Sequence, residues 1–223
     1  MTRKRVAVLI SGRGSNLQAL IDAAAAPDYP AEIVRVISNR PDAPGLAHAG
    51  KAGIPARTID HRRFKVRPAF EAALDAALRE DRVDLVCHAG FMRIHPTGFV
   101  DAWRDRCLNI HPSLLPAFPG LDTHGRALAA GVRIHGCTVH VLRAEVDAGP
   151  IIAQAAVPVL PGDDEAALAA RVLAAEHRIY PAALALYASG RARVDGERVV
   201  YDSSLAFPDA SLVYPLVAGP SPG

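Results

Sequence analysis

The segment Leu108-Asn109-Ile110-His111-Pro112 carries side chains that are well suited to chemistry. In extended backbone, alternate side chains share a face, so Asn109 and His111 would point together into a cleft while Leu108 and Ile110 pack inward. Pro112 disfavours helix at His111 and so supports the extended conformation. An amide donor beside an imidazole can stabilise a developing oxyanion and move a proton. The alternative is a strand end whose polar side chains only hydrogen-bond the adjacent loop.

A carboxylate that could serve this pair lies further along the chain, in Asp147-Ala148-Gly149-Pro150. An acid at the end of a strand, followed by glycine, is often only a turn former. If Asp147 reaches His111, its charge would favour the imidazolium form of that histidine.

A second candidate site is the glycine-rich turn at residues 11–16, which follows the apolar run 6–10 and precedes a helical pattern. Backbone N–H groups of such a turn, together with the start of the helix, can bind an anion, and Ser15 and Asn16 add side-chain donors. A nucleoside-triphosphate loop would need a lysine after the glycines. A dinucleotide site would need a third glycine and an acid where Ser38-Asn39-Arg40 stands. A small phosphate monoester remains, and the alternative is a simple strand-to-helix turn.

Histidines and cysteines do not form a metal-binding pattern. His135, Cys137 and His140 are close in sequence, but along a strand His140 faces away from the other two. Cys87, Cys107 and Cys137 are the three cysteines, an odd number without a Cys-x-x-Cys pair. We therefore expect no metal and no disulfide, and each cysteine is interpreted as a buried apolar residue in a reducing compartment.

The elements that would position these residues alternate between strand and helix. Apolar patterning predicts strands over 6–10, 32–38, 54–59, 83–87, 107–110, 134–142 and 151–158, and helices over 17–26, 46–52, 67–80 and 164–188, the last interrupted near Pro181. Residues 194–201 contain Asp195-Gly196 and predict a hairpin. The alternation indicates an α/β fold: a mostly parallel sheet flanked by helices, with an antiparallel edge formed by the last two long strands.

Composition restricts the class of protein. The chain has 223 residues, of which 50% are hydrophobic and 22% charged, with a formal net charge of +2. These values predict a folded domain over 1–202 and give no reason to expect nucleic acid or a membrane surface as partner. The run 6–10 is too short for a signal peptide, and no stretch approaches the length of a membrane span, so we expect a cytoplasmic protein. Pro, Gly and Ser accumulate over 203–223, which predicts a flexible tail.

Taken together, these residues resemble one family, the folate-dependent phosphoribosylglycinamide formyltransferases. The resemblance extends from about Val6 to Tyr201 and is carried by several motifs. They are ISGRGSNLQ at 10–18, AGFMRI at 89–94, LNIHPSLLP at 108–116, FPG at 118–120, GCTVH at 136–140, DAGP at 147–150, Glu176-His177 and Tyr180-Pro181.

The resemblance implies a single Rossmann-like domain and a role for each matching residue. Catalysis would involve Asn109, His111 and Asp147. The ribonucleotide and its phosphate would contact Gly14, Ser15, Asn16 and Glu176. The folate would contact Arg67, Met92, Arg93, Ile94, His95, Asn109, Arg143, Ala144, Glu145, Val146 and Asp147. The ribonucleotide site would belong mainly to the N-terminal half and the folate site to the C-terminal half. His95 stands where an apolar residue is common, and Asp122 where histidine often occurs. Residues 173–175 lack the polar groups that some relatives have there.

The activity implied is transfer of the formyl group of 10-formyltetrahydrofolate to the amine of phosphoribosylglycinamide, in purine biosynthesis. The partners would then be small molecules, without metal, nucleic acid or membrane, and the enzyme a monomer or homodimer. Two alternatives are a formyltetrahydrofolate deformylase and a nucleotide-binding module without catalysis. A deformylase usually has a further domain before the catalytic part. A binding module would have no reason to keep Asn109, His111 and Asp147 together.

Overall fold

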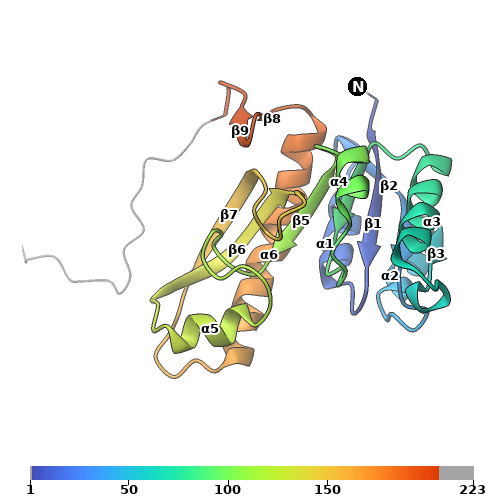
Figure 1. Ribbon diagram of the computed structural model, residues 1–223. Coiled ribbons are helices and arrows are strands. Elements are labelled where there is room, and N and C mark those ends of the chain that lie inside the picture. The colour runs from blue at the N-terminus through green and yellow to red at the C-terminus, as the bar shows by residue number, and fades with distance from the viewer. Residues whose placement is uncertain (1, 206–223) are drawn as a thin grey trace, which may run out of the picture.

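Seven strands form one mixed sheet in the order β3-β2-β1-β4-β5-β6-β7 (Figure 1). The computed structural model describes residues 2–205. The strands are β1 (Lys4–Ile10), β2 (Ala31–Ser38), β3 (Ala56–Thr58), β4 (Leu85–His88), β5 (Cys107–His111), β6 (Ile134–Val141) and β7 (Ile151–Pro158). Strands β1 to β5 pair in parallel, whereas β5–β6 and β6–β7 pair antiparallel. The predicted α/β fold with an antiparallel edge is therefore confirmed.

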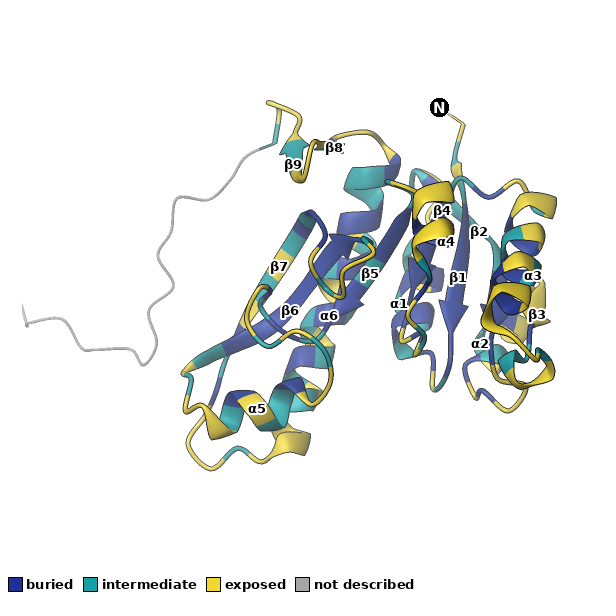
Figure 2. Ribbon diagram, in the orientation of Figure 1, coloured by how far each residue is buried: buried dark blue, intermediate teal, exposed yellow. Residues whose placement is uncertain are grey.

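Helices cover both faces of the sheet, and each face has its own hydrophobic core. The helices are α1 (Ser15–Ala24), α2 (Leu46–Lys51), α3 (Arg67–Glu80), α4 (Thr97–Ala102), α5 (Thr123–Ala129) and α6 (Glu165–Ala188), with a 3₁₀ turn at His61–Arg63. Val8 of β1 packs toward α1 and α6, while its neighbour Leu9 packs toward α3 and α4. This alternation explains why the apolar run in β1 is continuous, since both of its faces are buried (Figure 2).

The main differences from the predicted elements concern helices α4, α5 and α6 and strand β3. Helices α4 and α5 were not predicted, because each has few residues and begins with threonine followed by glycine, or by histidine and glycine, which leave no clear apolar period. Strand β3 is shorter than the predicted 54–59. Helix α6 is continuous across Pro181, so the predicted interruption is wrong. Buried residues on both sides of that proline, Tyr180 and Leu184, anchor the helix to the sheet, and this packing outweighs one missing backbone hydrogen bond.

The chain ends its described part in a small hairpin. Strands β8 (Ala192–Asp195) and β9 (Arg198–Tyr201) pair antiparallel around Gly196, whose φ of 63° suits the predicted turn. The predicted tail begins at Ser203, and from residue 206 it lies outside the described residues. Within residues 2–205, no helix is both long and apolar enough to cross a membrane.

Candidate active site

A cavity of about 650 Å³ opens at the carboxyl ends of β1, β4 and β5. It is lined by residues 88, 90–95, 109–112, 120–124, 142–144 and 146–147, together with Asn16, Glu165 and Glu176. The crevice beyond the carboxyl ends of parallel strands, where the strand order changes direction, is where open α/β sheets bind ligands. Here the change lies at β1, which is flanked by β2 and β4. Topology therefore places the predicted catalytic residues at the edge of the sheet where ligands bind.

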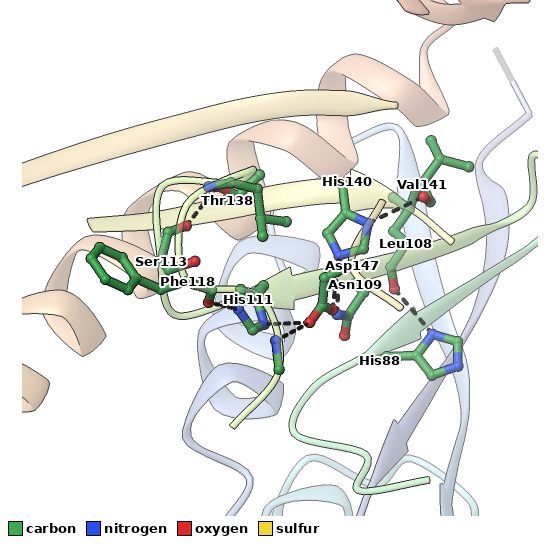
Figure 3. Close-up of polar contacts among 12 residues, drawn as sticks. His88, Leu108, Asn109, His111, Ser113, Phe118, Thr138, His140, Val141 and Asp147 are labelled. Carbon is green, nitrogen blue, oxygen red and sulfur yellow. Dashed lines mark hydrogen bonds and ion pairs between the residues drawn. The ribbon is translucent and has the colours of Figure 1, made fainter. Parts of the chain in front are cut away.

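Asn109 is oriented by a histidine that the sequence interpretation did not assign to the site. The antiparallel register sets Asn109 of β5 opposite His140 of β6. His140 Nδ1 donates to the Val141 carbonyl (3.2 Å), so its Nε2 carries a lone pair and accepts from Asn109 Nδ2 (3.2 Å) (Figure 3). Burial lowers the pKa of His140, which keeps the ring neutral and able to accept. One amide hydrogen of Asn109 is thus used for positioning, and the other can serve a substrate oxygen.

Both nitrogens of His111 face acceptors. Nε2 donates to the Phe118 carbonyl at 3.1 Å, and Nδ1 lies 3.4 Å from Asp147 Oδ2 (Figure 3). Two acceptors around one ring fix its orientation in the cavity. The 3.4 Å separation is longer than a good hydrogen bond, so the Nδ1 proton can also be shared with a substrate oxygen. The structure thus brings Asn109, His111 and Asp147 to one cavity, as the strand alternation predicted for the first two.

Asp147 is held by the backbone around it. Its Oδ2 accepts from the Gly120 N–H at 2.8 Å, and its own φ of 55° lies in the left-handed region. Two residues on, Gly149 passes so close to β6 that an added Cβ would sit 1.7 Å from the Val141 carbonyl oxygen. The loop therefore follows one path, and that path aims the carboxylate at His111 and, at 3.8 Å, at His140.

The start of α1 and the middle of α6 meet at the other side of the cavity. Asn16 Nδ2 donates to Glu176 Oε2 at 2.7 Å, although the two residues are 160 positions apart. Asn16 Oδ1 is buried and has no hydrogen-bond partner among residues 2–205. Burial raises the pKa of Glu176, and the bond from Asn16 only partly opposes this. Asn16 Oδ1 can still accept a hydrogen bond, and the Glu176 carboxyl lies beside it. The two groups together suit a ligand that carries a hydroxyl or an amine.

We expect Glu176→Gln to change how stability depends on pH. The folded-state pKa of Glu176 is raised, so the native protein loses stability as pH rises through that pKa and the buried carboxyl must ionise. Glutamine keeps the acceptor for Asn16 but cannot ionise. The melting temperature of the variant relative to wild type should therefore be higher at about pH 8 than at about pH 5. An unchanged difference between the two pH values would contradict the raised pKa.

The glycine turn has the geometry expected of an anion site. Gly14 adopts φ 74°, and a Cβ there would lie 2.8 Å from Gly45 Cα. No side chain caps α1 at this residue, so the N–H groups of its first turn remain available to a ligand. Asn16 lines the large cavity, whereas Ser15 lines an adjoining surface pocket together with Arg13 and His48. The turn thus lies between the cavity and solvent.

The predicted folate residues divide into three groups. Met92, Ile94 and Val146 are exposed apolar side chains that line the cavity. A ligand bound there would cover their apolar surface. Arg93, His95 and Ala144 also line it. Arg67, which is exposed at the start of α3, and Glu145 are not among the residues that line the cavity.

Arg143 contributes to the wall of the cavity through its position more than through a free charge. Its Nε donates to Glu197 Oε2 at 2.7 Å, and its Nη2 lies 2.9 Å from Asp105 Oδ1. The hairpin β8–β9 therefore holds the loop that carries Asp147. Sequence reasoning missed this ion pair because Glu197 lies 54 residues further along.

No group of three or more His, Cys, Asp or Glu side chains within residues 2–205 is arranged to hold a metal ion. Cys87, Cys107 and Cys137 are buried free thiols.

Comparisons with known proteins match this arrangement. The formyl transferase family model matches residues 4–184. The chain is 55% identical over 188 residues to the human trifunctional purine biosynthetic protein adenosine-3, covering 84% of this chain but 19% of that protein, so it spans about a fifth of this longer relative. It is 44% identical over 201 residues to the phosphoribosylglycinamide formyltransferase of Escherichia coli K12, covering 87% of this chain and 95% of that enzyme.

A solved structure agrees with the sequence matches. Glycinamide ribonucleotide transformylase 1 from Symbiobacterium toebii has a TM-score of 0.87 and 51% identity, covering 89% of this chain and 94% of its own. The family model spans every segment that lines the cavity. The chain therefore belongs to the formyl transferase family and, within it, to the phosphoribosylglycinamide formyltransferases.

Proposed function

We propose that this protein transfers the formyl group of 10-formyltetrahydrofolate to the amine of phosphoribosylglycinamide, giving formylglycinamide ribonucleotide and tetrahydrofolate. The observation that carries the proposal is the convergence of Asn109, His111 and Asp147 on one cavity that also contains the Asn16–Glu176 pair. One side of the cavity thus offers groups for a polar, phosphorylated substrate. The other side offers exposed apolar side chains for a flat aromatic one.

Binding would use the two sides separately. The phosphate would lie against Gly14, Ser15 and the first N–H groups of α1, with the ribose and glycinamide near Asn16 and Glu176. The folate would lie along Met92 to His95 and the loop Arg143 to Asp147. Such placement directs the amine of one substrate and the formyl carbon of the other toward Asn109 and His111.

Attack of the neutral amine on the formyl carbon forms a carbon–nitrogen bond and an alkoxide oxygen. The Asn109 amide hydrogen not bonded to His140, and the Nδ1–H of His111, would both donate to that oxygen. Asp147, close to His111 and fixed by the Gly120 N–H, stabilises the imidazolium during this step. Donors already oriented toward the developing charge need little reorganisation when it appears.

Collapse of the tetrahedral intermediate breaks the bond from the formyl carbon to N10 of the folate. The amine gives up a proton and N10 receives one, and Asp147 is placed to order a water that carries it between them. No covalent enzyme intermediate is needed in this scheme. We further propose that the protein is cytoplasmic, that its partners are small molecules, and that it is a monomer or homodimer.

The test is an absorbance assay for tetrahydrofolate formation with purified protein and 10-formyltetrahydrofolate, with and without phosphoribosylglycinamide. Product that forms only when the ribonucleotide is present supports the proposal. Equal product without the ribonucleotide would identify a deformylase. Ribonucleotide binding by calorimetry without any product would identify a binding module.

A further inference from the structure

Three buried polar side chains outside the proposed chemistry form a continuous hydrogen-bonded chain. Glu71 Oε2 of α3 lies 2.8 Å from His95 Nδ1, and His95 Nε2 lies 2.9 Å from His88 Nε2 at the end of β4. His88 Nδ1 in turn lies 3.1 Å from the Leu108 carbonyl of β5 (Figure 3). All three residues are at most 5% exposed. Such a buried chain requires that each link pairs a donor with an acceptor.

The carbonyl at one end determines where the protons lie. Leu108 O can only accept, so His88 carries its proton on Nδ1, and burial lowers the pKa of His88 to about 3, which keeps the ring neutral. His88 Nε2 is then an acceptor, and His95 Nε2 must donate to it. One proton remains for the Glu71–His95 contact: either the carboxyl donates to Nδ1, or the imidazolium donates to the carboxylate. In both forms the three side chains share a net charge of zero.

Aromatic packing fixes the central ring. His95 is stacked between Phe91, at 5.5 Å and 12°, and Phe99, at 4.2 Å and 16°. Ring faces carry partial negative charge, so this sandwich also accommodates the imidazolium form. Two other basic groups lie nearby. His140 contributes to lowering the pKa of His88, and the Arg93 guanidinium lies over the Phe70 ring. His95 can therefore form its two hydrogen bonds in one orientation.

The chain joins the two ends of a segment that lines the cavity. The His88–His95 bond closes residues 89–94 into a loop, and Ser11 Oγ holds its middle by accepting from the Met92 N–H at 2.8 Å. His88 is also the register partner of Asn109 in the neighbouring strand. Exposed Met92 and Ile94 project from this clamped segment. Its shape therefore depends on the Glu71–His95–His88 chain.

We propose that Glu71 and His95 share one proton beside a neutral His88, and that all three act as positioning residues that hold the 89–94 wall in the shape that binds the folate. The proposal rests on the proposed function, because it takes the cavity as a folate site. It assigns Glu71, which lies outside the cavity lining, a role in co-substrate affinity. It also gives every ring nitrogen of the two histidines a hydrogen-bond partner in an otherwise apolar core, whereas Glu71 Oε1 has none among residues 2–205.

Two substitutions of Glu71 separate this role from simple packing. In Glu71→Gln, the amide nitrogen can donate to His95 Nδ1, so the chain persists with a neutral His95. In Glu71→Ala, Nδ1 loses its partner and the chain is broken. We expect alanine to raise KM for 10-formyltetrahydrofolate about tenfold and glutamine to leave it within about twofold. KM for the ribonucleotide and kcat should stay close to wild type in both variants. Glu80→Ala, on the same helix at the surface, is the matched control.

Nitrogen-15 NMR of the ligand-free protein tests the proton assignment without any activity measurement. We expect His88 to be neutral with its proton on Nδ1, and in Glu71→Gln we expect His95 to be neutral with its proton on Nε2. His88 protonated on Nε2, or alanine and glutamine variants with the same KM, would overturn the proposal. If the tautomers are as expected and no folate turns over in any variant, the proposed function fails while the hydrogen-bonded chain stands. If Glu71→Ala does not fold, the spectra of wild type and of Glu71→Gln still test where the protons of His88 and His95 lie.

Discussion

Replacing His111 by alanine should lower kcat by a factor of about 10² or more, and Asp147→Ala should act in the same direction. In the proposed mechanism, His111 would supply one donor to the alkoxide that forms during attack, and Asp147, 3.4 Å away, would hold the ring in place for that contact. Neither substitution removes a residue of the two apolar cores, so circular dichroism should show the native fold. Steady-state kinetics with both substrates at saturation give the comparison.

His135→Gln is a demanding control for that experiment. The His135 ring packs edge-on against Phe118, whose backbone carbonyl accepts from His111, so His135 lies close to the proposed catalytic histidine. Burial and the neighbouring His124 lower the pKa of His135 to about 4, which keeps its ring neutral. We expect the melting temperature of this variant to be lower than that of wild type and its kcat to stay close to the wild-type value. If His111→Ala retained near-normal turnover, or if both histidine variants lost kcat equally, the catalytic assignment of His111 would be wrong.

A bulky residue at position 14 should raise KM for the ribonucleotide at least about tenfold while changing KM for the folate little. In Gly14→Val, the side chain must adopt φ 74° and would meet Gly45 Cα at 2.8 Å, so the turn has to move. The N–H groups at the start of α1 move with it and no longer meet the phosphate. Initial-rate kinetics with each substrate varied in turn separate the two KM values.

Gly12→Ala is the matched control in the same turn. A Cβ at Gly12 has nothing within 4 Å among the described residues, and its φ is outside the left-handed region. Both KM values should therefore remain close to wild type. A dephosphorylated substrate that bound as well as the phosphorylated one would show that the turn is only structural.

Sequence patterns predicted the central strands of the sheet well because these strands are buried on both faces. Val6 to Ile10 and Leu85 to Cys87 are continuous apolar runs, and only the interior of a parallel sheet requires such runs. The two short helices α4 and α5 were not predicted, since few residues and local turn formers leave no period to detect. Pro181 misled the interpretation because a local rule was applied to a helix that tertiary packing holds in place.

The candidate site was predictable where residues are adjacent in sequence and unpredictable where they meet through the fold. Alternation along β5 sufficed to bring Asn109 and His111 to one cavity. The partners of these residues could not be located the same way: His140 reaches Asn109 through strand register, and Glu176 reaches Asn16 across 160 positions. For His140 a cue existed, since its side chain faces away from His135 and Cys137.

The left-handed backbone at Asp147 limits which residues can stand there in evolution. Aspartate, asparagine and glycine adopt φ near 55° with little strain, while most other side chains are disfavoured. An Asp147→Asn change would therefore keep the backbone path of the loop and remove the charge beside His111. In the proposed function, a descendant carrying that change would still bind ribonucleotide and folate and would turn them over slowly. The loop geometry thus leaves open a short path from a working enzyme to a binding protein that sequesters its former substrates.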